Sequence, residues 1–308
     1  MVTHPVGGPV TARLLGITRA RRVTLKLSAG NVDMSVIALF GAGGKMGIRL
    51  GMNLKEAGAT VRHVEVSPAG QQRVKSILGY DAIDPEAALD GADAIILAVP
   101  DTLISKVAGS IVADLAAGTM VIILDAAAPH AGHLPKREDI TYFVTHPCHP
   151  PIFNDETSLD AKRDFFGGIA AKQHAVCALM QGPEEDYAKG EAIARMIWAP
   201  VMTCHRISVA QMAILEPGLS ETLCASLLDV MREALDEVVR LGVPREAARD
   251  FLLGHMNVLG AVIFKETDGV FSDACNKAIQ FGKPVLMRDD WKRIFEPDEI
   301  MASIRRIT

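Results

Sequence analysis

Short apolar runs and helical patterns alternate along residues 36–180 of the chain. Val36–Phe40 is an apolar run followed by glycine, which is typical of a buried parallel strand. Residues 45–57 then carry Met46, Leu50 and Leu54 on one helical face, until Gly58 ends the pattern. Further strands are expected at 60–66, 94–99, 121–124, 142–145 and 175–180, and further helices at 68–78 and 103–115. This alternation predicts an α/β fold with a doubly wound parallel sheet and right-handed crossovers.

The pattern becomes wholly helical near residue 206. Apolar residues recur at helical spacing from Ser208 to Gly242, and helices also fit residues 244–264, 270–280 and 296–306. Pro217-Gly218 is expected to kink or divide the first of these helices. We therefore predict two folded domains, residues 34–206 and an all-helical domain 207–308, with a cleft between them. The apolar segment 208–241 also predicts a homodimer in which the helical domains pair.

The composition is that of an ordinary globular protein. Of 308 residues, 49% are hydrophobic and 22% are charged, and the formal net charge is −5. We expect no nucleic-acid partner, because there is no basic surplus to neutralise phosphates. We expect no membrane span, since no apolar run reaches the roughly 18–20 residues required. Five cysteines without a CxxC pair indicate reduced thiols and a cytoplasmic protein.

Residues 1–33 differ in character from the rest of the chain. They contain five arginine and lysine residues but a single acid, Asp33. An Arg-rich, acid-poor start resembles a transit peptide. Met34, however, directly precedes the first predicted strand. We expect residues 1–33 to be an N-terminal extension that is not part of the fold.

A glycine-rich loop joins the first predicted strand to the first predicted helix. Its sequence is Gly41-Ala42-Gly43-Gly44-Lys45-Met46-Gly47. Glycines at Gly41, Gly43 and Gly44 allow a tight turn and a close approach of the backbone to a pyrophosphate, while Gly47 allows close packing of helix on strand. The helix N-terminus, at Lys45 and Met46, supplies N–H groups for the anion. The loop predicts a Rossmann-type dinucleotide-binding domain, although its spacing departs from GxGxxG.

The second predicted strand carries a carboxylate in the position that selects the cofactor. Glu65 lies near its end, about 20 residues after the glycine loop, where an acid binds both ribose hydroxyls. Because a carboxylate repels a 2′-phosphate, we expect NAD rather than NADP. Arg62 and His63 keep NADP open as an alternative. A second alternative is an ordinary glycine turn beside a surface glutamate, without a cofactor.

The ends of the third and fourth predicted strands are expected on the nicotinamide side. Val99, Pro100 and Asp101 follow the third strand, and Asp125 follows the fourth. Ligands of open α/β sheets bind outside the carboxyl ends of the strands. We therefore expect these four residues to contact the cofactor, with helix capping as the alternative for either aspartate.

Two histidines follow the fifth predicted strand. His146 and His149 lie in the run His-Pro-Cys-His-Pro-Pro, whose prolines make the loop rigid. The run is expected at the same sheet edge as the nicotinamide. Each histidine can therefore act as a general base, a substrate donor or a metal ligand, and a purely structural role is the alternative.

Glu216 is an isolated acid within an apolar helical stretch. A buried carboxylate is costly unless it is paired or bound to a metal. His146 and Glu216 can together bind a divalent cation, with water or substrate in the other positions. The alternative is an ion pair between Glu216 and an arginine. Ser220 and Glu221 follow four and five residues later, near the same face if the helix continues.

The helical half lacks one common catalytic group. No lysine occurs between Lys189 and Lys265, so none can act as the base there. A metal ion or a histidine would have to do that work. His255, on a later apolar helix, can reach the predicted cleft, and a satisfied core histidine is the alternative. The predicted catalytic set is therefore His146, His149, Glu216 and His255.

These motifs together carry a family resemblance. The glycine loop, the Ala98–Asp101 turn, the His146–Pro151 loop and the Ile214–Pro217 run resemble those of NAD-dependent oxidoreductases with a phosphogluconate-dehydrogenase-like C-terminal domain. The resemblance covers residues 34–308. More specifically, the chain resembles the family of D-apionate oxidoisomerases, which implies that D-apionate, a branched sugar acid, is converted with NAD into 3-oxo-isoapionate and NADH through a carbon-skeleton rearrangement. It also implies a metal ion, zinc, at His146 and Glu216.

Two other functions remain open from the sequence. One is a metal-free NAD(P)-dependent dehydrogenase or oxidative decarboxylase of a small hydroxy or sugar acid, with His146 or His255 as base. The other is a protein that senses NAD(H) without turnover. The polar residues of the predicted cleft argue against the sensor, which has no need of them.

Overall fold

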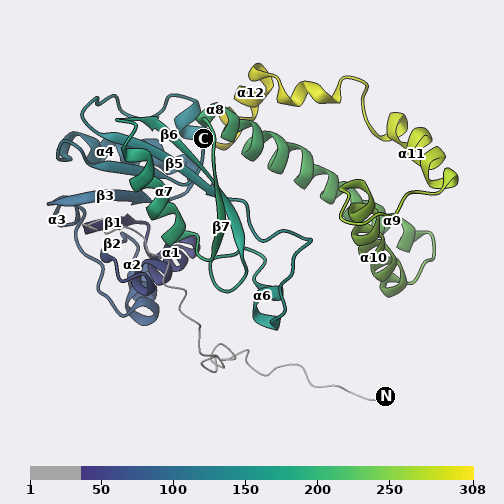
Figure 1. Ribbon diagram of the computed structural model, residues 1–308, viewed down its shortest axis with the longest axis horizontal. Helices are drawn as coiled ribbons and strands as arrows, with labels where there is room; N and C mark the ends of the chain where they lie inside the picture. The colour runs from purple at the N-terminus through teal and green to yellow at the C-terminus, as the bar shows by residue number, and fades with distance from the viewer. Residues whose placement is uncertain (1–35) are drawn as a thin grey trace, which may run out of the picture. The chain divides into compact units, whose positions relative to one another are not determined.

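The computed structural model describes residues 36–308, which form a seven-stranded sheet followed by a series of helices (Figure 1). The predicted extension, residues 1–33, lies outside the described residues. The strands are β1 (Val36–Phe40), β2 (Thr60–Val64), β3 (Ala92–Leu97), β4 (Met120–Ile123), β5 (Thr141–Pro147), β6 (Gln173–Gln181) and β7 (Val201–Arg206). Their order is β2-β1-β3-β4-β5-β6-β7. The predicted doubly wound Rossmann-type sheet is thereby confirmed.

Helices cover both faces of the sheet. They are α1 (Lys45–Glu56), α2 (Pro68–Arg73), the π-helix η1 (Val74–Leu78), α3 (Pro85–Leu89), α4 (Asp101–Ile111), the 3₁₀-helix η2 (Val112–Asp114), α5 (Ala127–His130), α6 (Leu159–Arg163) and α7 (Asp186–Ile197). Successive strand residues alternate between two cores. Ile95 belongs to the same core as Ile104 of α4, whereas Ile96 belongs to the core that contains Leu50 of α1.

One strand direction differs from the prediction. All neighbouring strands are parallel except β5 and β6, which are antiparallel. A parallel connection needs a substantial crossover, usually a helix. The segment between Pro147 and Gln173 holds only the five-residue α6, so β6 returns in the opposite direction.

The sequence pattern also missed β7 and α7. β7 lies at the edge of the sheet and is half-buried or exposed along its length, so it lacks an apolar signature. α7 provides the crossover between β6 and β7, which are therefore parallel.

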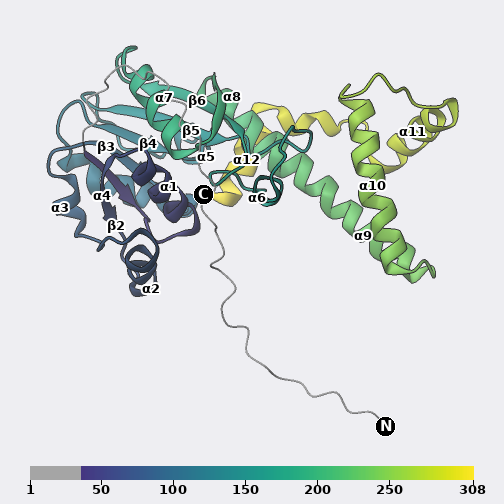
Figure 2. The same cartoon turned by 60° about the horizontal axis from the view of Figure 1, so that its bottom comes forward.

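Every described element after Arg206 is helical. These elements are α8 (Val209–Ala213), the π-helix η3 (Ile214–Ala225), α9 (Ser226–Arg240), α10 (Arg245–Ile263), α11 (Asp273–Leu286), the 3₁₀-helix η4 (Trp291–Phe295) and α12 (Pro297–Ile307). α8, η3 and α9 follow one another without a break (Figure 2). The predicted kink at Pro217-Gly218 is therefore replaced by a widened helix. The domain boundary at 206/207 stays a prediction.

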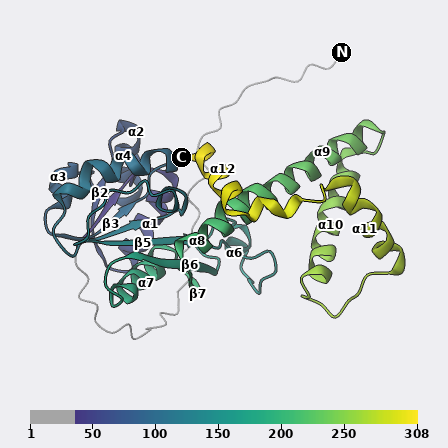
Figure 3. The ribbon, with the colours of Figure 1, turned by 90° about the horizontal axis from the view of Figure 1, so that it is seen from above.

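The helical region is attached to the sheet at its two ends. Met212 and Ala213 of α8, and Ile300 and Ile304 of α12, are buried in the core that contains α4 and α5. Between them, α9, α10 and α11 extend away from the sheet (Figure 3). Ala248 is the one buried residue among these three helices. None of the helices between residues 36 and 308 combines the length and apolar character needed to cross a membrane.

Candidate active site

Three potential ligand side chains meet where the ends of β4 and β5 face helix η3. Asp125 follows β4, His146 lies near the end of β5, and Glu216 lies in the first turn of η3. One ligand atom from each lies within 4.8 Å of the others, and all three residues are half-buried. His146 Nε2 is 3.2 Å from Glu216 Oε2. No arginine among residues 36–308 pairs with Glu216, so its partner is the histidine.

Hydrogen bonds outside the cluster orient its members. His146 Nδ1 lies 2.8 Å from the carbonyl oxygen of Leu124, which can only accept, so Nδ1 carries the proton. Asp125 Oδ1 accepts from the backbone N–H of Ala127 at 2.6 Å. A neutral His146 would then present an Nε2 lone pair to a carboxylate oxygen. Two atoms that both offer lone pairs, 3.2 Å apart, need a cation or a proton between them. These side chains therefore fit as ligands of a divalent metal ion.

A cavity of about 360 Å³ joins this cluster to the glycine loop. Nine of the predicted site residues line it: Gly44, Lys45, Met46, Val99, Pro100, Asp101, Asp125, His146 and Glu216. Glu221 lines it as well, whereas Ser220 does not. Predicted cofactor residues and predicted metal ligands therefore share one space, as hydride transfer beside a metal requires.

The glycine loop forms an anion cradle at the start of α1. Gly44 caps the helix without a side-chain hydrogen bond, and no acidic residue lies in its first turn. Gly41 has φ 73°, and a Cβ there would meet the Ala98 carbonyl oxygen at 2.3 Å. A Cβ on Gly47 would lie 2.1 Å from the Gly41 carbonyl oxygen. The helix N–H groups thus remain open to a pyrophosphate, and the loop fits a dinucleotide.

Glu65 is held beside the glycine loop. Its Oε2 accepts from the backbone N–H of Gly43 at 3.0 Å, and its Oε1 accepts from the backbone N–H and hydroxyl of Ser67, each at 2.9 Å. Although burial acts in the other direction, these hydrogen bonds lower the pKa of Glu65 below its ordinary value. Glu65 is therefore an anion at neutral pH beside the glycine loop, and its role at the ribose hydroxyls stays a prediction.

Excess negative charge characterises the cavity. Burial, followed by the nearby Asp125 carboxylate, raises the pKa of Asp101 to about 6, while His146 opposes the shift. Burial also raises the pKa of Glu221, with further contributions from Glu216, Asp125 and Asp101. A divalent cation would relieve the repulsion among these carboxylates.

Two predicted histidines lie outside this cavity. His149 has φ 61° and its Nδ1 is 2.9 Å from the Phe166 carbonyl oxygen, with its ring 6.0 Å from that of His146. His255 lies on α10, where its ring stacks on Phe251 at 3.9 Å and its Nδ1 is 2.8 Å from the Phe251 carbonyl oxygen. The structure does not bring His255 to the cluster. The catalytic roles of both histidines stay predictions.

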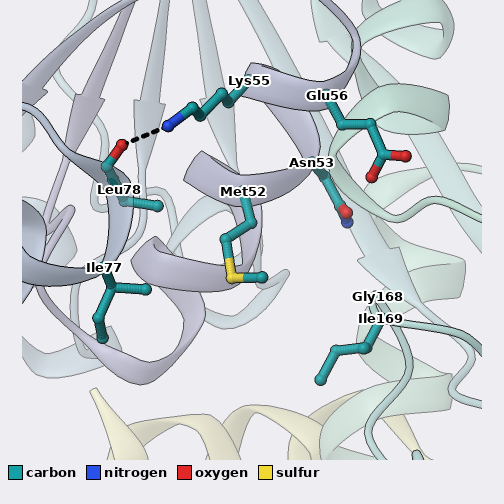
Figure 4. Close-up of a pocket in the computed structure, with 8 residues that line it drawn as sticks. All are labelled: Met52, Asn53, Lys55, Glu56, Ile77, Leu78, Gly168 and Ile169. Atoms are coloured by element: carbon teal, nitrogen blue, oxygen red, sulfur yellow. Dashed lines mark hydrogen bonds between the residues drawn. The ribbon is translucent and has the colours of Figure 1, made fainter. Parts of the chain in front are cut away.

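A second cavity of about 480 Å³ lies at the other end of α1 (Figure 4). Two of its polar side chains already donate to backbone carbonyl oxygens. Lys55 Nζ donates to that of Leu78 at 2.6 Å, and Asn53 donates to those of Ile197 and Ala199. Met52, Ile77 and Ile169 supply much of the remaining lining. No metal-ligating cluster among the described residues reaches it.

Two family models match the chain. Residues 154–308 match the model described as phosphogluconate dehydrogenase (decarboxylating) C-term, and residues 36–129 match the one described as NADP oxidoreductase coenzyme F420-dependent. The boundary between the matches falls within the sheet, before β6.

Curated relatives match about nine-tenths of the chain. The chain is 70% identical over 275 residues to a D-apionate oxidoisomerase from Rhizobium rhizogenes, covering 89% of this chain and 100% of the relative. It is 65% identical over 272 residues to a D-apionate oxidoisomerase from Cupriavidus necator, covering 88% and 99%. A solved structure of a semialdehyde dehydrogenase NAD-binding protein from Cupriavidus necator, in complex with calcium and NAD, shares 65% identity with a TM-score of 0.88. That match covers 89% of this chain and 99% of the solved chain.

Proposed function

Because the chain belongs to the family of D-apionate oxidoisomerases, we propose that it converts D-apionate and NAD into 3-oxo-isoapionate and NADH in the catabolism of apiose. The family makes the protein an NAD-dependent oxidoreductase. The substrate, the rearrangement and the participation of a metal are the proposal. The single observation that carries it is the Asp125–His146–Glu216 cluster, which opens into the same cavity as the glycine loop.

The chain's own residues suit NAD. The α1 N-terminus, at Lys45 and Met46, would hold the pyrophosphate, which Gly43 and Gly44 would allow to approach closely. Ionised Glu65 would accept from the adenosine ribose hydroxyls. The same carboxylate disfavours a 2′-phosphate. When bound, NAD supplies the hydride acceptor. Val99, Pro100 and Asp101 would border its nicotinamide end, since they line the cavity between loop and cluster.

His146 and Glu216 would hold the metal, with Asp125 as a third ligand. We favour zinc among the ions that accept nitrogen and oxygen ligands. When bound, the ion supplies a Lewis acid that polarises the substrate oxygens during carbon migration. The Leu124 carbonyl keeps His146 Nε2 free for this role. The arrangement removes the need for a lysine base, which the chain lacks between Lys189 and Lys265.

Formation of NADH from D-apionate tests the proposal. The purified protein, loaded with zinc, is mixed with D-apionate and NAD, and absorbance of NADH is followed before and after chelation. We expect turnover that chelator abolishes and zinc restores. Full activity in chelator would favour a metal-free dehydrogenase or decarboxylase. NADH binding without oxidation of any sugar acid would favour a sensor.

We also propose that the protein works as a homodimer. Between residues 227 and 286, eighteen large apolar side chains are at least 37% exposed. Monomeric proteins rarely expose large contiguous apolar patches, whereas the interfaces of homodimers are rich in apolar side chains. A second copy of the chain therefore fits this surface.

A groove between α9 and α10 gives the proposed interface its centre. It has a volume of about 330 Å³ and is lined by Leu228, Met231, Leu235, Leu252, Leu253 and Met256, with Arg232 and Arg249. Light scattering at micromolar concentration should give twice the chain mass, and Leu253→Glu should give a monomer. Leu103→Glu, at an exposed position of α4, is the matched control. A monomeric wild-type protein would contradict the assembly.

The thiols support a cytoplasmic location, which we propose as well. All five cysteines are free, and Cys148 and Cys224 are exposed. Free exposed thiols are typical of a reducing compartment.

A further inference from the structure

We propose that Glu221 is a catalytic residue that accepts the proton of a substrate hydroxyl, and that the π-helical form of η3 places it in the active site. This inference rests on the proposed function, because it assigns a role within the same cavity. Glu221 lines that cavity together with Glu216, five residues earlier on η3.

The placement depends on the width of the helix. In an α-helix, with 3.6 residues per turn, residues five positions apart point about 140° away from each other. In a π-helix the hydrogen bonds run between residues five apart instead of four, so each turn takes more residues than in an α-helix and positions five apart lie closer to the same side. η3 is π-helical from Ile214 to Ala225, which includes both glutamates. The widened helix therefore turns Glu216 and Glu221 to the same side.

Local contacts hold η3 in this form. Pro217 lies inside the helix and has no N–H to donate. The Thr222 hydroxyl donates to the Pro217 carbonyl oxygen at 2.6 Å and lies 3.3 Å from the Ser303 hydroxyl of α12. Gly218 is buried, and a Cβ there would meet Ile300 Cδ1 at 2.8 Å. π-helical segments are rare and occur frequently at functional sites.

The surroundings of Glu221 suit a proton acceptor. Its carboxylate accepts no hydrogen bond from any residue between 36 and 308, and it stays accessible to solvent, to which it can pass a proton. The charged or titratable groups that line the cavity around it are Glu216, Asp125, Asp101, His146 and Lys45. Burial is the largest cause that raises the pKa of Glu221, and a raised pKa increases its basicity.

The proposed step is a single proton transfer. The O–H bond of a substrate hydroxyl breaks, its electron pair stays on the substrate oxygen, and a new O–H bond forms at Glu221 Oε. The proton then leaves to water. Glu221 is separate from the metal ligands, because the cluster whose atoms lie within 4.8 Å of one another comprises only Asp125, His146 and Glu216 among the described residues.

Glu221→Gln tests this role, with Glu221→Asp as the conservative variant. We expect Gln to lower kcat at neutral pH by about 100-fold or more, as for loss of a general base. Binding of D-apionate to the enzyme–NADH complex, measured by calorimetry without turnover, should change less than about threefold, since the shape of the side chain is kept. Zinc content should be unchanged. The acidic limb of the kcat/KM profile should disappear in Gln and return in Asp.

Glu233→Gln, on the exposed surface of α9, is the matched control and should behave as wild type. Loss of zinc in Glu221→Gln would make Glu221 a ligand and overturn the proposal. A weaker Kd with kcat retained, or an unchanged pH profile, would overturn it too. If wild type makes no NADH from D-apionate, the proposed function itself fails. Wild-type turnover with an unimpaired Gln variant contradicts Glu221 alone.

Discussion

His146 Nε2 lies 3.2 Å from Glu216 Oε2, while the opposite ring nitrogen is held by the Leu124 carbonyl oxygen at 2.8 Å. The contact joins the last residues of a sheet strand to a helix 70 positions later in the sequence. The contact can therefore form only when the sheet and the helical region are both folded. It also directs the Nε2 lone pair of His146 toward the Asp125–His146–Glu216 cluster.

Removing either member of this pair should remove the metal. We expect Glu216→Gln and His146→Asn to lose at least about tenfold in zinc affinity, because each removes a ligand from a three-residue set, and to lose turnover with it. Elemental analysis after dialysis against buffered zinc measures the loss. His133→Asn, an exposed histidine outside the cavity, is the control. Full zinc content in Glu216→Gln would refute its role as a ligand.

Gly47→Ala should damage the cofactor site. Its added Cβ would meet backbone atoms, the Gly41 carbonyl oxygen at 2.1 Å and Ala42 Cα at 2.8 Å, so the loop must shift. NADH affinity, measured by fluorescence titration, should fall by about tenfold or more, which is about 1.4 kcal/mol. Gly109→Ala, in α4 with open space around it, should bind NADH normally and gain up to about 1 kcal/mol of stability. Normal NADH binding by Gly47→Ala would be inconsistent with this loop as the cradle.

Asp101 should make the metal-free protein less stable as pH rises. Its folded pKa of about 6 lies above the ordinary value of 3.8, so the folded state binds more protons between these values. The free energy of unfolding therefore falls as pH increases through this window. Asp101→Asn should raise Tm by about 2–4 °C at pH 7.5 and leave it nearly unchanged at pH 4. Thermal denaturation in chelator checks this.

Asp114→Asn, an exposed acid of η2, is the control and should show no such pH-dependent gain. An equal effect of Asp101→Asn at both pH values would point to altered packing instead of a buried charge.

The parts of the fold that follow from local sequence were predicted well. β1 and the glycine loop were identified because an apolar run, a glycine turn and a helical face follow each other directly. β6 runs antiparallel to β5 because the connection between them, residues 148–172, lacks a crossover helix. No local pattern in these residues indicates the direction of the strand that follows. The edge strand β7 has no buried face to create a pattern.

The candidate site likewise combines residues that the sequence predicted with others whose position depends on the tertiary structure. His146, Glu216 and Asp101 stand out in the sequence as polar residues beside apolar elements, and the structure brings them to one cavity. Asp125 was expected only at the cofactor, since its approach to His146 depends on how β4 and β5 end. Whether Ser220 or Glu221 faces Glu216 depends on helix width, and Pro217 predicted a kink where the structure has a π-helix. His255 was expected to reach the cleft, but its position depends on the tertiary course of α10.

The identity of the reaction product tests the central claim most directly. ¹³C-labelled D-apionate is incubated with NAD and the zinc-loaded enzyme, and the carbon skeleton of the product is read by NMR while NADH is counted by absorbance. We expect one 3-oxo-isoapionate with a rearranged skeleton for each NADH formed. NADH accompanied by an unrearranged keto acid, or no NADH at all, would contradict a metal-assisted oxidoisomerase.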